Sequence, residues 1–300
     1  MFVNNRLGLN VQNSLYNKQE KQRYLINHRI NKLVKKDLTY ILGAKCFDGI
    51  VLVGDTKITV GEGTNYEYGR KLFKPFTSVV MGASGASGLY ASFQNRMEVM
   101  VREQESQKIN LNDHEKLKTL AENVIREMHK IYEQDRYFLI NNLNVLMAIR
   151  VGSEPELVNI TGLGLPEPVN SVKVIGHGEP HGALFIKKMW KSTMTMEQTA
   201  KLALFIIKLI EDTQIDASVG YCTDCLPQVY YLPTVYLPDG LDEKAYNKMK
   251  QEEKQAVIDE AYELRPIIEL THDEVNRFIN EISSKISDFD NLFIKGQFKI

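Results

Sequence analysis

Thr39, Asp55 and Lys71 are residue types that together can hydrolyse an amide bond. Asp55 lies 16 residues after Thr39 and Lys71 lies 32 residues after it, and a glycine-rich segment containing Gly85 follows. A threonine hydroxyl can attack a carbonyl carbon if its own freed α-amino group accepts the proton. A lysine ammonium lowers the pKa of that hydroxyl and amine, and a carboxylate keeps the lysine charged and in place. The spacing therefore raises the hypothesis of a hydrolase whose nucleophile is an N-terminal threonine.

The apolar pattern predicts the elements that must position these residues. Asp48-Gly49 joins two strand-like runs, 40–47 and 50–53, as in a tight β-hairpin, and a short apolar run, 79–81, precedes the glycine-rich segment. Further helices are predicted over 88–105, 114–135, 180–190 and 196–211, and further strands over 144–151, 172–175 and 228–236. This order is typical of an α+β fold in which antiparallel sheets lie between layers of helices.

The composition is that of an ordinary globular protein. The chain has 300 residues, of which 43% are hydrophobic and 25% charged, so it can bury a sizeable core. A formal net charge of −1 gives no general reason to expect nucleic acid or an anionic membrane as partner. No stretch approaches the ~20 apolar residues of a membrane span, and no signal-peptide pattern opens the chain. Three cysteines do not make a disulfide framework, so we expect a cytoplasmic protein.

Charge divides the chain into three parts. Residues 1–38 hold eight Lys and Arg against two acids, which we interpret as a propeptide or an N-terminal docking segment. Residues 39–238 form the predicted body. Residues 239–300 carry fourteen acids against nine bases and form an acidic helical extension. In it, Thr271-x-x-Glu274 predicts a capping box that opens a helix over 275–286 with one apolar face. We expect that face to pack on the body, and docking of a partner is the alternative.

The segments TYILGAKCFDGIVLVGDTKI and GRKLFKPFTSVVMGASGASG closely resemble the opening of a proteasome-type subunit. The match runs without a gap from Thr39 to Gly88, and Thr39 falls on the mature N-terminal threonine of the family's catalytic β-subunits. Asp55 and Lys71 fall on the family's aspartate and lysine. A later stretch that begins GHGEPHGALFIKKMW resembles the family's second helix pair. The resemblance covers about residues 39–238 and does not reach the last sixty.

The resemblance implies a four-layer αββα sandwich, the fold of the N-terminal-nucleophile hydrolases, and a homo- or hetero-oligomeric ring. Thr39 would then be the nucleophile, Lys71 would tune it, Asp55 would anchor Lys71, and the Gly85 N–H would bind the oxyanion. The Thr59 backbone would pair with a peptide or protein substrate. The side-chain pocket would be lined by Ile58, Gly69, Phe73, Ala83 and Ser87. No charge stands among these residues, so a small or apolar substrate side chain is expected.

The chain departs from the family's active members at three places. They place glycine before the threonine, whereas Leu38 precedes Thr39 here, and the Leu38–Thr39 bond must be cut to free the amine. They place a serine between two glycines where this chain has His177, which as a site residue could bind by hydrogen bonds or block the site. Asp216 and Ser218 match the family's last catalytic aspartate and serine only in approximate register.

Two other functions therefore stay open. The noncatalytic α-type subunits of the same family keep an uncleaved N-terminal segment and often the equivalents of Asp55 and Lys71, so the chain could be a structural subunit. Alternatively, the acyl-enzyme could react with an amine instead of water, which would make the protein a peptide ligase.

Metal and cofactor chemistry has weaker support. Cys222-x-x-Cys225 is half of a zinc or redox motif, and His177 and His181 could complete a set of four ligands. Isolated pairs of this kind are more often structural, so we expect no metal and no cofactor. The glycines of 82–88 are not followed by the Gly-Lys-Ser/Thr of a phosphate-binding loop.

Overall fold

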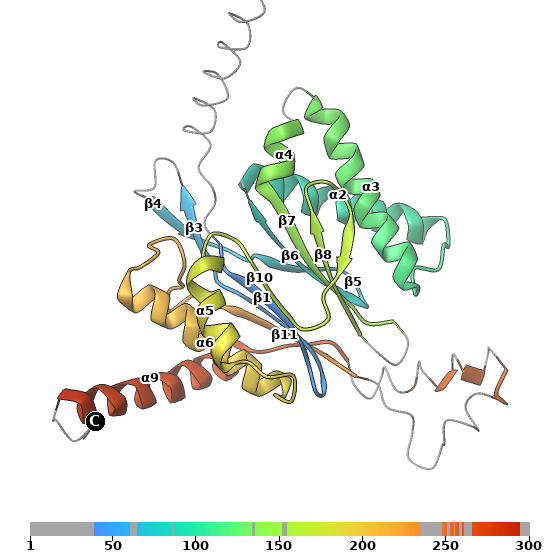
Figure 1. The fold of residues 1–300 in the computed structure, drawn as a ribbon. Helices are drawn as coiled ribbons and strands as arrows, with labels where there is room; N and C mark the ends of the chain where they lie inside the picture. Colours follow the sequence, from blue (N-terminus) through green and yellow to red (C-terminus); the bar gives the residue numbers. More distant parts are fainter. Residues whose placement is uncertain are drawn as a thin grey trace, which may run out of the picture.

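Two five-stranded antiparallel sheets lie face to face between layers of helices in a computed structural model of the chain (Figure 1). The structure describes residues 39–60, 65–85, 87–133, 136–151, 155–234 and 266–294, with a few isolated positions between 248 and 260. The predicted segment 1–38, the Leu38–Thr39 bond and most of 235–265 lie outside the described residues. Within the described part of the chain, no helix is both long and apolar enough to span a membrane.

The first sheet carries the start of the body and is completed by strands from the far end of the chain. Its strands in spatial order are β10 (Val172–Ile175), β1 (Ile41–Cys46), β2 (Gly49–Gly54), β11 (Gln228–Pro233) and β12 (Ile268–Glu269). The hairpin predicted at Asp48-Gly49 is confirmed, because Cys46 pairs with Gly49 across it. The acidic extension supplies β12, which no local pattern predicted.

The second sheet presents the glycine-rich segment. Its strands in spatial order are β5 (Leu72–Phe76), β6 (Val79–Gly85), β7 (Leu143–Ile149), β8 (Glu156–Thr161) and β9 (Pro166–Pro168). A separate hairpin of β3 (Lys57–Val60) and β4 (Asn65–Tyr68) connects the two sheets. Leu52 and Leu146, one from each sheet, belong to the same buried cluster, which fills the space between the sheets.

Helices cover the two outer faces. The second sheet is covered by α2 (Ser87–Ser106) and α3 (His114–Ile131), with α4 (Arg136–Asn142) leading into β7. The first sheet is covered by α5 (Glu179–Met189), α6 (Met196–Thr213) and α9 (His272–Ile294). Strand side chains alternate between the two faces of a sheet, so each sheet packs helices on one face and the other sheet on its second face. The predicted four-layer αββα sandwich is confirmed.

The last helix packs on the body, as its apolar face predicted. Its N-terminus has the predicted capping box, with the Thr271 N–H donating to Glu274 at 2.8 Å and the Glu274 N–H donating back to Thr271 Oγ1 at 3.3 Å. Four of its apolar residues are buried in the same cluster as α6: Val275, Phe278, Ile279 and Ile282. The acidic extension is therefore part of the globular body along this helix.

Candidate active site

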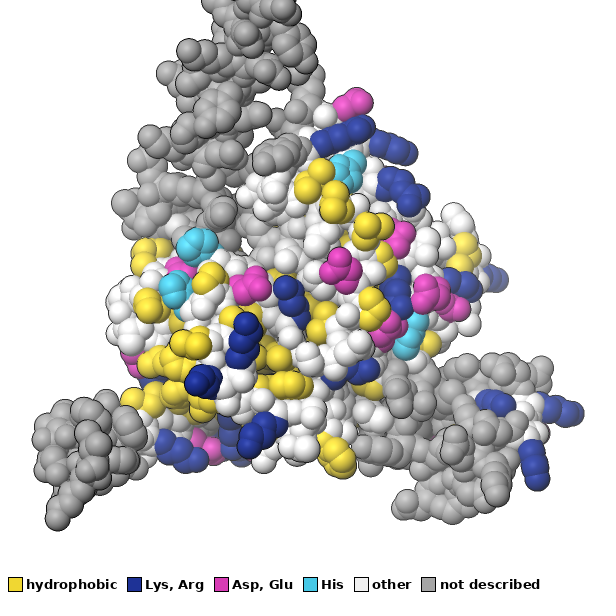
Figure 2. Space-filling model, viewed as in Figure 1, with side chains coloured by type: hydrophobic (Ala, Val, Ile, Leu, Met, Phe, Trp, Pro, Cys, Tyr) yellow, Lys and Arg dark blue, Asp and Glu magenta, His cyan; other side chains and the backbone are white. Residues whose placement is uncertain are grey.

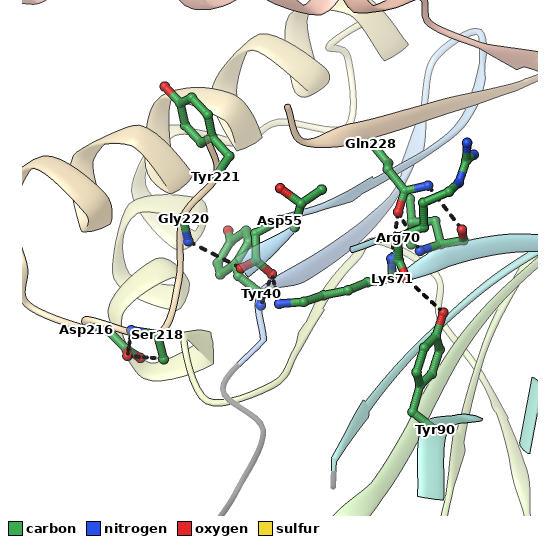
Figure 3. Close-up of polar contacts among 12 residues, drawn as sticks. Tyr40, Asp55, Arg70, Lys71, Tyr90, Asp216, Ser218, Gly220, Tyr221 and Gln228 are labelled. Carbon is green, nitrogen blue, oxygen red and sulfur yellow. Dashed lines mark hydrogen bonds and ion pairs between the residues drawn. The ribbon is translucent and has the colours of Figure 1, made fainter. Parts of the chain in front are cut away.

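Asp55 is the centre of a buried hydrogen-bond network that joins distant parts of the chain. It follows β2 directly and is fully buried. Its Oδ1 accepts hydrogen bonds from Lys71 Nζ at 2.7 Å and from the Tyr40 N–H at 2.8 Å, and its Oδ2 accepts from the Gly220 N–H at 3.2 Å (Figure 3). Burial raises the pKa of Asp55, whereas the Lys71 ammonium and the two N–H donors oppose that rise. Each member of the ion pair thus compensates for the buried charge of the other.

Thr39 is held by its backbone on both sides. The next residue, Tyr40, binds Asp55, while the Thr39 carbonyl accepts a hydrogen bond from the Gly178 N–H at 3.3 Å. Gly176 has a φ of +104°, and a Cβ at that position would lie 1.9 Å from the Thr39 carbonyl oxygen. Only glycine fits so close to another backbone. The turn of residues 176–178 therefore packs directly against Thr39, whose exposed fraction is 3%.

Gln228, at the start of β11, fixes the backbone that carries Lys71. Its side-chain Oε1 accepts hydrogen bonds from the N–H groups of Lys71 and Leu72 at 2.7 and 2.8 Å, and its Nε2 donates to the Leu72 carbonyl at 3.1 Å (Figure 3). The side chain is buried. Sequence reasoning missed Gln228 and Gly220, because their contacts join residues far apart in the chain.

Gly85 and His177 line the same cavity. Gly85 ends β6 with a φ of +137°, and a Cβ there would lie 1.6 Å from the Asn142 carbonyl oxygen, so no other residue type fits. The cavity has a volume of about 450 Å³ and is also lined by Gly176 and by residues 140–144. Because Gly176 packs against Thr39, this cavity lies beside the candidate nucleophile.

His177, Asp216 and Ser218 form one hydrogen-bonded cluster. His177 Nδ1 lies 3.1 Å from Asp216 Oδ2, and both the hydroxyl and the N–H of Ser218 donate to Asp216 Oδ1, the N–H at 3.1 Å. Burial alone would raise the pKa of Asp216, but the hydrogen bonds from Ser218 and His177 outweigh it, and the pKa is lowered. The sequence left the register of Asp216 and Ser218 open, and the structure brings both residues to His177.

Four of the five residues predicted for the side-chain pocket lie in two places in the structure. Ile58 lies against Gly69, where a Cβ would be 2.9 Å from Ile58 Cδ1. Phe73 and Ala83 are buried in the core cluster that packs on α2 and α3. The fifth residue, Ser87, begins α2, but its side chain lies outside the described atoms. Thr59, the residue predicted to pair with substrate through its backbone, is on β3 with its side chain buried.

The four residues considered for zinc do not gather into a ligand set. Cys222 and Cys225 face each other across an isolated backbone bridge, and His177 binds Asp216. Among the residues that the structure describes, no three His, Cys, Asp or Glu side chains are grouped as metal ligands would be.

The arrangement can support nucleophilic chemistry at Thr39. The same carboxylate oxygen binds the Lys71 ammonium and the N–H of the residue after Thr39, which places a positive charge next to the Thr39–Tyr40 peptide. A cation in a buried setting stabilises negative charge that develops on a nearby hydroxyl. The cavity lined by Gly85, Gly176 and His177 lies next to this group, across the turn that packs on Thr39.

Comparison with known proteins identifies the family. The model of the proteasome subunit family matches residues 38–221. No curated protein sequence matches the chain. Among solved structures, Anbu (ancestral beta-subunit) from Yersinia bercovieri is similar with a TM-score of 0.62 at 15% identity, covering 87% of this chain and 98% of that one.

Two structures of Anbu from Hyphomicrobium sp. strain MC1 are also similar. The Gly-1 mutant has a TM-score of 0.53 at 18% identity, covering 75% of this chain and 96% of that one. The second has a TM-score of 0.51 at 17% identity, with coverage of 75% and 97%. The structural similarity to these proteins supports the fold, and the match to the family model covers more than half of the chain. The chain is a divergent member of the proteasome subunit family, with the proteasome-like N-terminal-nucleophile hydrolase fold.

Proposed function

We propose that the protein is a threonine-type peptidase, made as a precursor and activated by cleavage of the Leu38–Thr39 bond. The observation that carries this proposal is the buried ion pair between Asp55 and Lys71, built directly against the backbone of Thr39. Burying both charges is costly, and such pairs cluster at functional sites, so the position of this pair beside a threonine supports a chemical role for it. Under this proposal, residues 1–38 are the propeptide.

The reaction follows from the positions of these groups. Thr39 Oγ attacks the substrate carbonyl carbon while the freed α-amine of Thr39 takes the hydroxyl proton. The tetrahedral oxyanion accepts a hydrogen bond from the Gly85 N–H, a contribution of about 3 kcal/mol where one such donor was removed from another hydrolase. The intermediate collapses to an ester on Thr39 and releases the amine, which takes the proton back. Water then hydrolyses the ester and frees Thr39.

The cluster of His177, Asp216 and Ser218 serves as a positioning unit for the precursor bond and for the free amine. Asp216 accepts from both partners, so it fixes the imidazole of His177 on the rim of the cavity, where the side chain is 47% exposed. The turn that carries His177 also donates the Gly178 N–H to the Thr39 carbonyl. His177 therefore replaces the family's serine as a polar group at this turn.

The substrate side chain is proposed to be small or apolar. Ile58, Gly69, Phe73, Ala83 and Ser87 offer no charge to bind a charged side chain. Phe73 and Ala83 are already buried in the core, so they would form the floor of the pocket and Ile58 its wall. Chromogenic peptides that differ only in the residue before the cleaved bond, with alanine, leucine, lysine or glutamate there, test this specificity.

Intact mass and N-terminal sequencing of the purified full-length protein test the precursor step. A chain that begins at Thr39 supports the proposal, and a chain that keeps residues 1–38 after assembly contradicts it. Thr39→Ala should abolish peptide cleavage and leave folding unchanged, because the nucleophilic hydroxyl is lost while the backbone contacts remain. Unchanged hydrolysis in this variant would remove Thr39 from the mechanism.

A noncatalytic subunit is the competing function, and the burial of Thr39 favours it. With 3% of its surface exposed in the intact chain, Thr39 is closed to substrate. The two functions separate at cleavage, because only a peptidase precursor needs the Leu38–Thr39 bond cut to free the Thr39 amine. A structural subunit would keep the segment and act through its surfaces alone.

We also propose that copies of this chain, or of related chains, assemble into a ring. Hydrophobic side chains gather over α5 and α6 with lysines among them (Figure 2). Leu184 and Met189 of α5 are 62% and 47% exposed. Exposed apolar side chains in a group are typical of surfaces that bind other proteins. Analytical ultracentrifugation of the wild type and of Leu184→Glu tests assembly, which the charge should weaken if α5 lies in the contact.

A further inference from the structure

Cys222 and Cys225 face each other across a tight turn as an antiparallel backbone pair. The N–H of Cys222 donates to the Cys225 carbonyl at 3.4 Å, and the N–H of Cys225 donates to the Cys222 carbonyl at 3.1 Å. Antiparallel residues that exchange both hydrogen bonds have Cα atoms about 5.5 Å apart, with both side chains on one face. A disulfide needs a Cα separation of roughly 4.4 to 6.8 Å. The Cα spacing of such a pair suits a disulfide, and its Cβ atoms, about 4.5–5.5 Å apart, must approach to roughly 3.5–4.5 Å for the bond to close. The two sulfurs can therefore join with a small local adjustment of the turn.

Both thiols are free and partly exposed, so a small reagent can reach them. The third cysteine, Cys46, provides an internal contrast. Its thiol contacts Thr199 Oγ1 at 3.3 Å, and burial raises its pKa to about 11. The thiolate is the reactive form of cysteine, so Cys46 is expected to be inert under conditions in which an exposed pair reacts.

The turn is bonded to the candidate active site. Thr56 Oγ1 donates to the Cys225 carbonyl at 2.6 Å, and the N–H groups of Thr56 and Lys57 donate to the Gly220 carbonyl at 3.2 and 3.1 Å. Gly220 in turn donates its own N–H to Asp55. Residues 220–225 therefore hold the segment that runs from Asp55 into β3.

The last helix contacts the same turn. His272, the first residue of α9, has its Nε2 3.0 Å from the Thr223 carbonyl. The turn is thus fixed at three points, on Asp55, on the start of β3 and on α9. A crosslink across it would stiffen a junction between the acidic extension and the site.

We propose that Cys222 and Cys225 form a reversible dithiol–disulfide site that reacts with small-molecule disulfides. One thiolate attacks a sulfur of the reagent, forms a mixed disulfide and releases the first small thiol. The second thiolate attacks the protein sulfur of that mixed disulfide, closes the Cys222–Cys225 bond and releases the second small thiol. Two protein thiols are oxidised, one small disulfide is reduced to two thiols, and two protons pass to the released thiols at neutral pH. The site does not depend on the proposed peptidase activity.

The test uses the full-length protein in buffers of reduced and oxidised glutathione. After acid quenching and alkylation with N-ethylmaleimide, peptide mass spectrometry should find Cys222 linked to Cys225, two hydrogens lighter than the reduced peptide. Dithiothreitol should reverse the link, and Cys46 should be alkylated only after unfolding. In Cys222→Ser, Cys225 should stop at the mixed disulfide with glutathione. Full alkylation of both cysteines across the whole range of buffers would overturn the proposal, as would equal reactivity of Cys46.

A second measurement separates a built site from two thiols that are merely exposed. Oxidation should raise the melting temperature of the wild type, because the crosslink restricts the unfolded chain and fixes the turn. The Cys222→Ala/Cys225→Ala variant, which lacks both thiols, should not respond to the same treatment. A disulfide that forms but lowers the melting temperature would show that the turn must distort to accept it, and would overturn the inferred fit.

Discussion

Arg70 and Lys71 are neighbours in the chain and carry the same charge, yet their ion pairs belong to different regions of the molecule. The side chains of Lys71 and Asp55 are 5% and 0% exposed, whereas those of Arg70 and Glu269 are 62% and 40% exposed. An ion pair exposed to water contributes little to the free energy of unfolding, because solvent screens both charges. In the interior, each charge depends on its partner. Burial, more than charge, therefore marks Lys71 as a functional candidate and Arg70 as a surface residue.

The His177–Asp216 pair is intermediate. Its side chains are 47% and 5% exposed, so one partner faces solvent while the other is buried. The three ion pairs therefore form a series of increasing exposure, from Asp55–Lys71 through Asp216–His177 to Glu269–Arg70. Removing one partner should have effects in the same order.

The largest effect is expected for Lys71→Met. This change leaves the Asp55 carboxylate buried without a cation, which typically costs about 3–5 kcal/mol of unfolding free energy. Urea denaturation measures the loss, and under the proposed function peptide cleavage should vanish with it. The Asp55→Asn/Lys71→Met variant removes both charges and should recover part of the stability. A single variant as stable as the wild type would show that the pair is not coupled as the contacts indicate.

Gln228→Leu should cause the next largest loss of stability. The change removes the acceptor for two buried N–H groups, those of Lys71 and Leu72, and an unsatisfied buried donor costs about 1–3 kcal/mol. Gln228→Glu keeps the acceptor oxygen and is the matched variant, which should retain the contact to Lys71. Denaturation curves for the two variants test the role of the amide. Equal stability of Gln228→Leu and the wild type would mean that water replaces it.

The pair at His177 predicts a pH dependence. The folded-state pKa of Asp216 is lowered, so its contribution to stability is present above the unfolded-state pKa of about 3.9 and is lost as the pH falls through the folded value. The stability difference between the wild type and Asp216→Asn should therefore shrink as the pH falls below about 5. Urea denaturation across this range checks it. A difference that grows toward low pH would reverse the assigned direction.

Glu269→Gln should have the smallest effect. An exposed ion pair contributes about 0–1 kcal/mol, and salt reduces it further. Thermal melts at low and high ionic strength should differ slightly for the wild type and less for the variant. A loss as large as that of Lys71→Met would mean that Glu269 and Tyr230, which are also hydrogen-bonded, hold β12 in place more strongly than exposure suggests.

The sequence predicted best what depends on near neighbours. Asp48-Gly49 predicted the hairpin, and Thr271 with Glu274 predicted the start of α9. Each of these signals is contained within four consecutive residues. The helix predicted over 114–135 ends at Ile131, where the Tyr132 N–H still bonds to Met128. β8 was not among the predicted strands, and its four central residues, with the polar Asn159 among them, are all buried, so its burial does not follow the alternation of polar and apolar types in its sequence.

The site was predicted only in part, for the same reason. Thr39, Asp55 and Lys71 were found through the resemblance of one ungapped segment, and the structure brings Asp55 and Lys71 together beside Thr39. Gly220 and Gln228 gave no signal, because a backbone N–H has no sequence signature and a glutamine in a strand looks ordinary. Their partners lie 165 and 157 residues away in the chain. Only the folded sheet shows that they belong to the site.

The placement of β11 between β2 and β12 also determines when the first sheet can be completed during translation. β2 is made among the first residues of the body, but its partner β11 and the donor at Gly220 leave the ribosome only after most of the chain has been synthesised. Contacts between residues so far apart form late in folding. Asp55 and Lys71 therefore gain their complete surroundings only after most of the chain has been made. Under the proposed function, the site cannot assemble on the early nascent chain, and Thr39 becomes reactive only after this assembly and after cleavage of the Leu38–Thr39 bond.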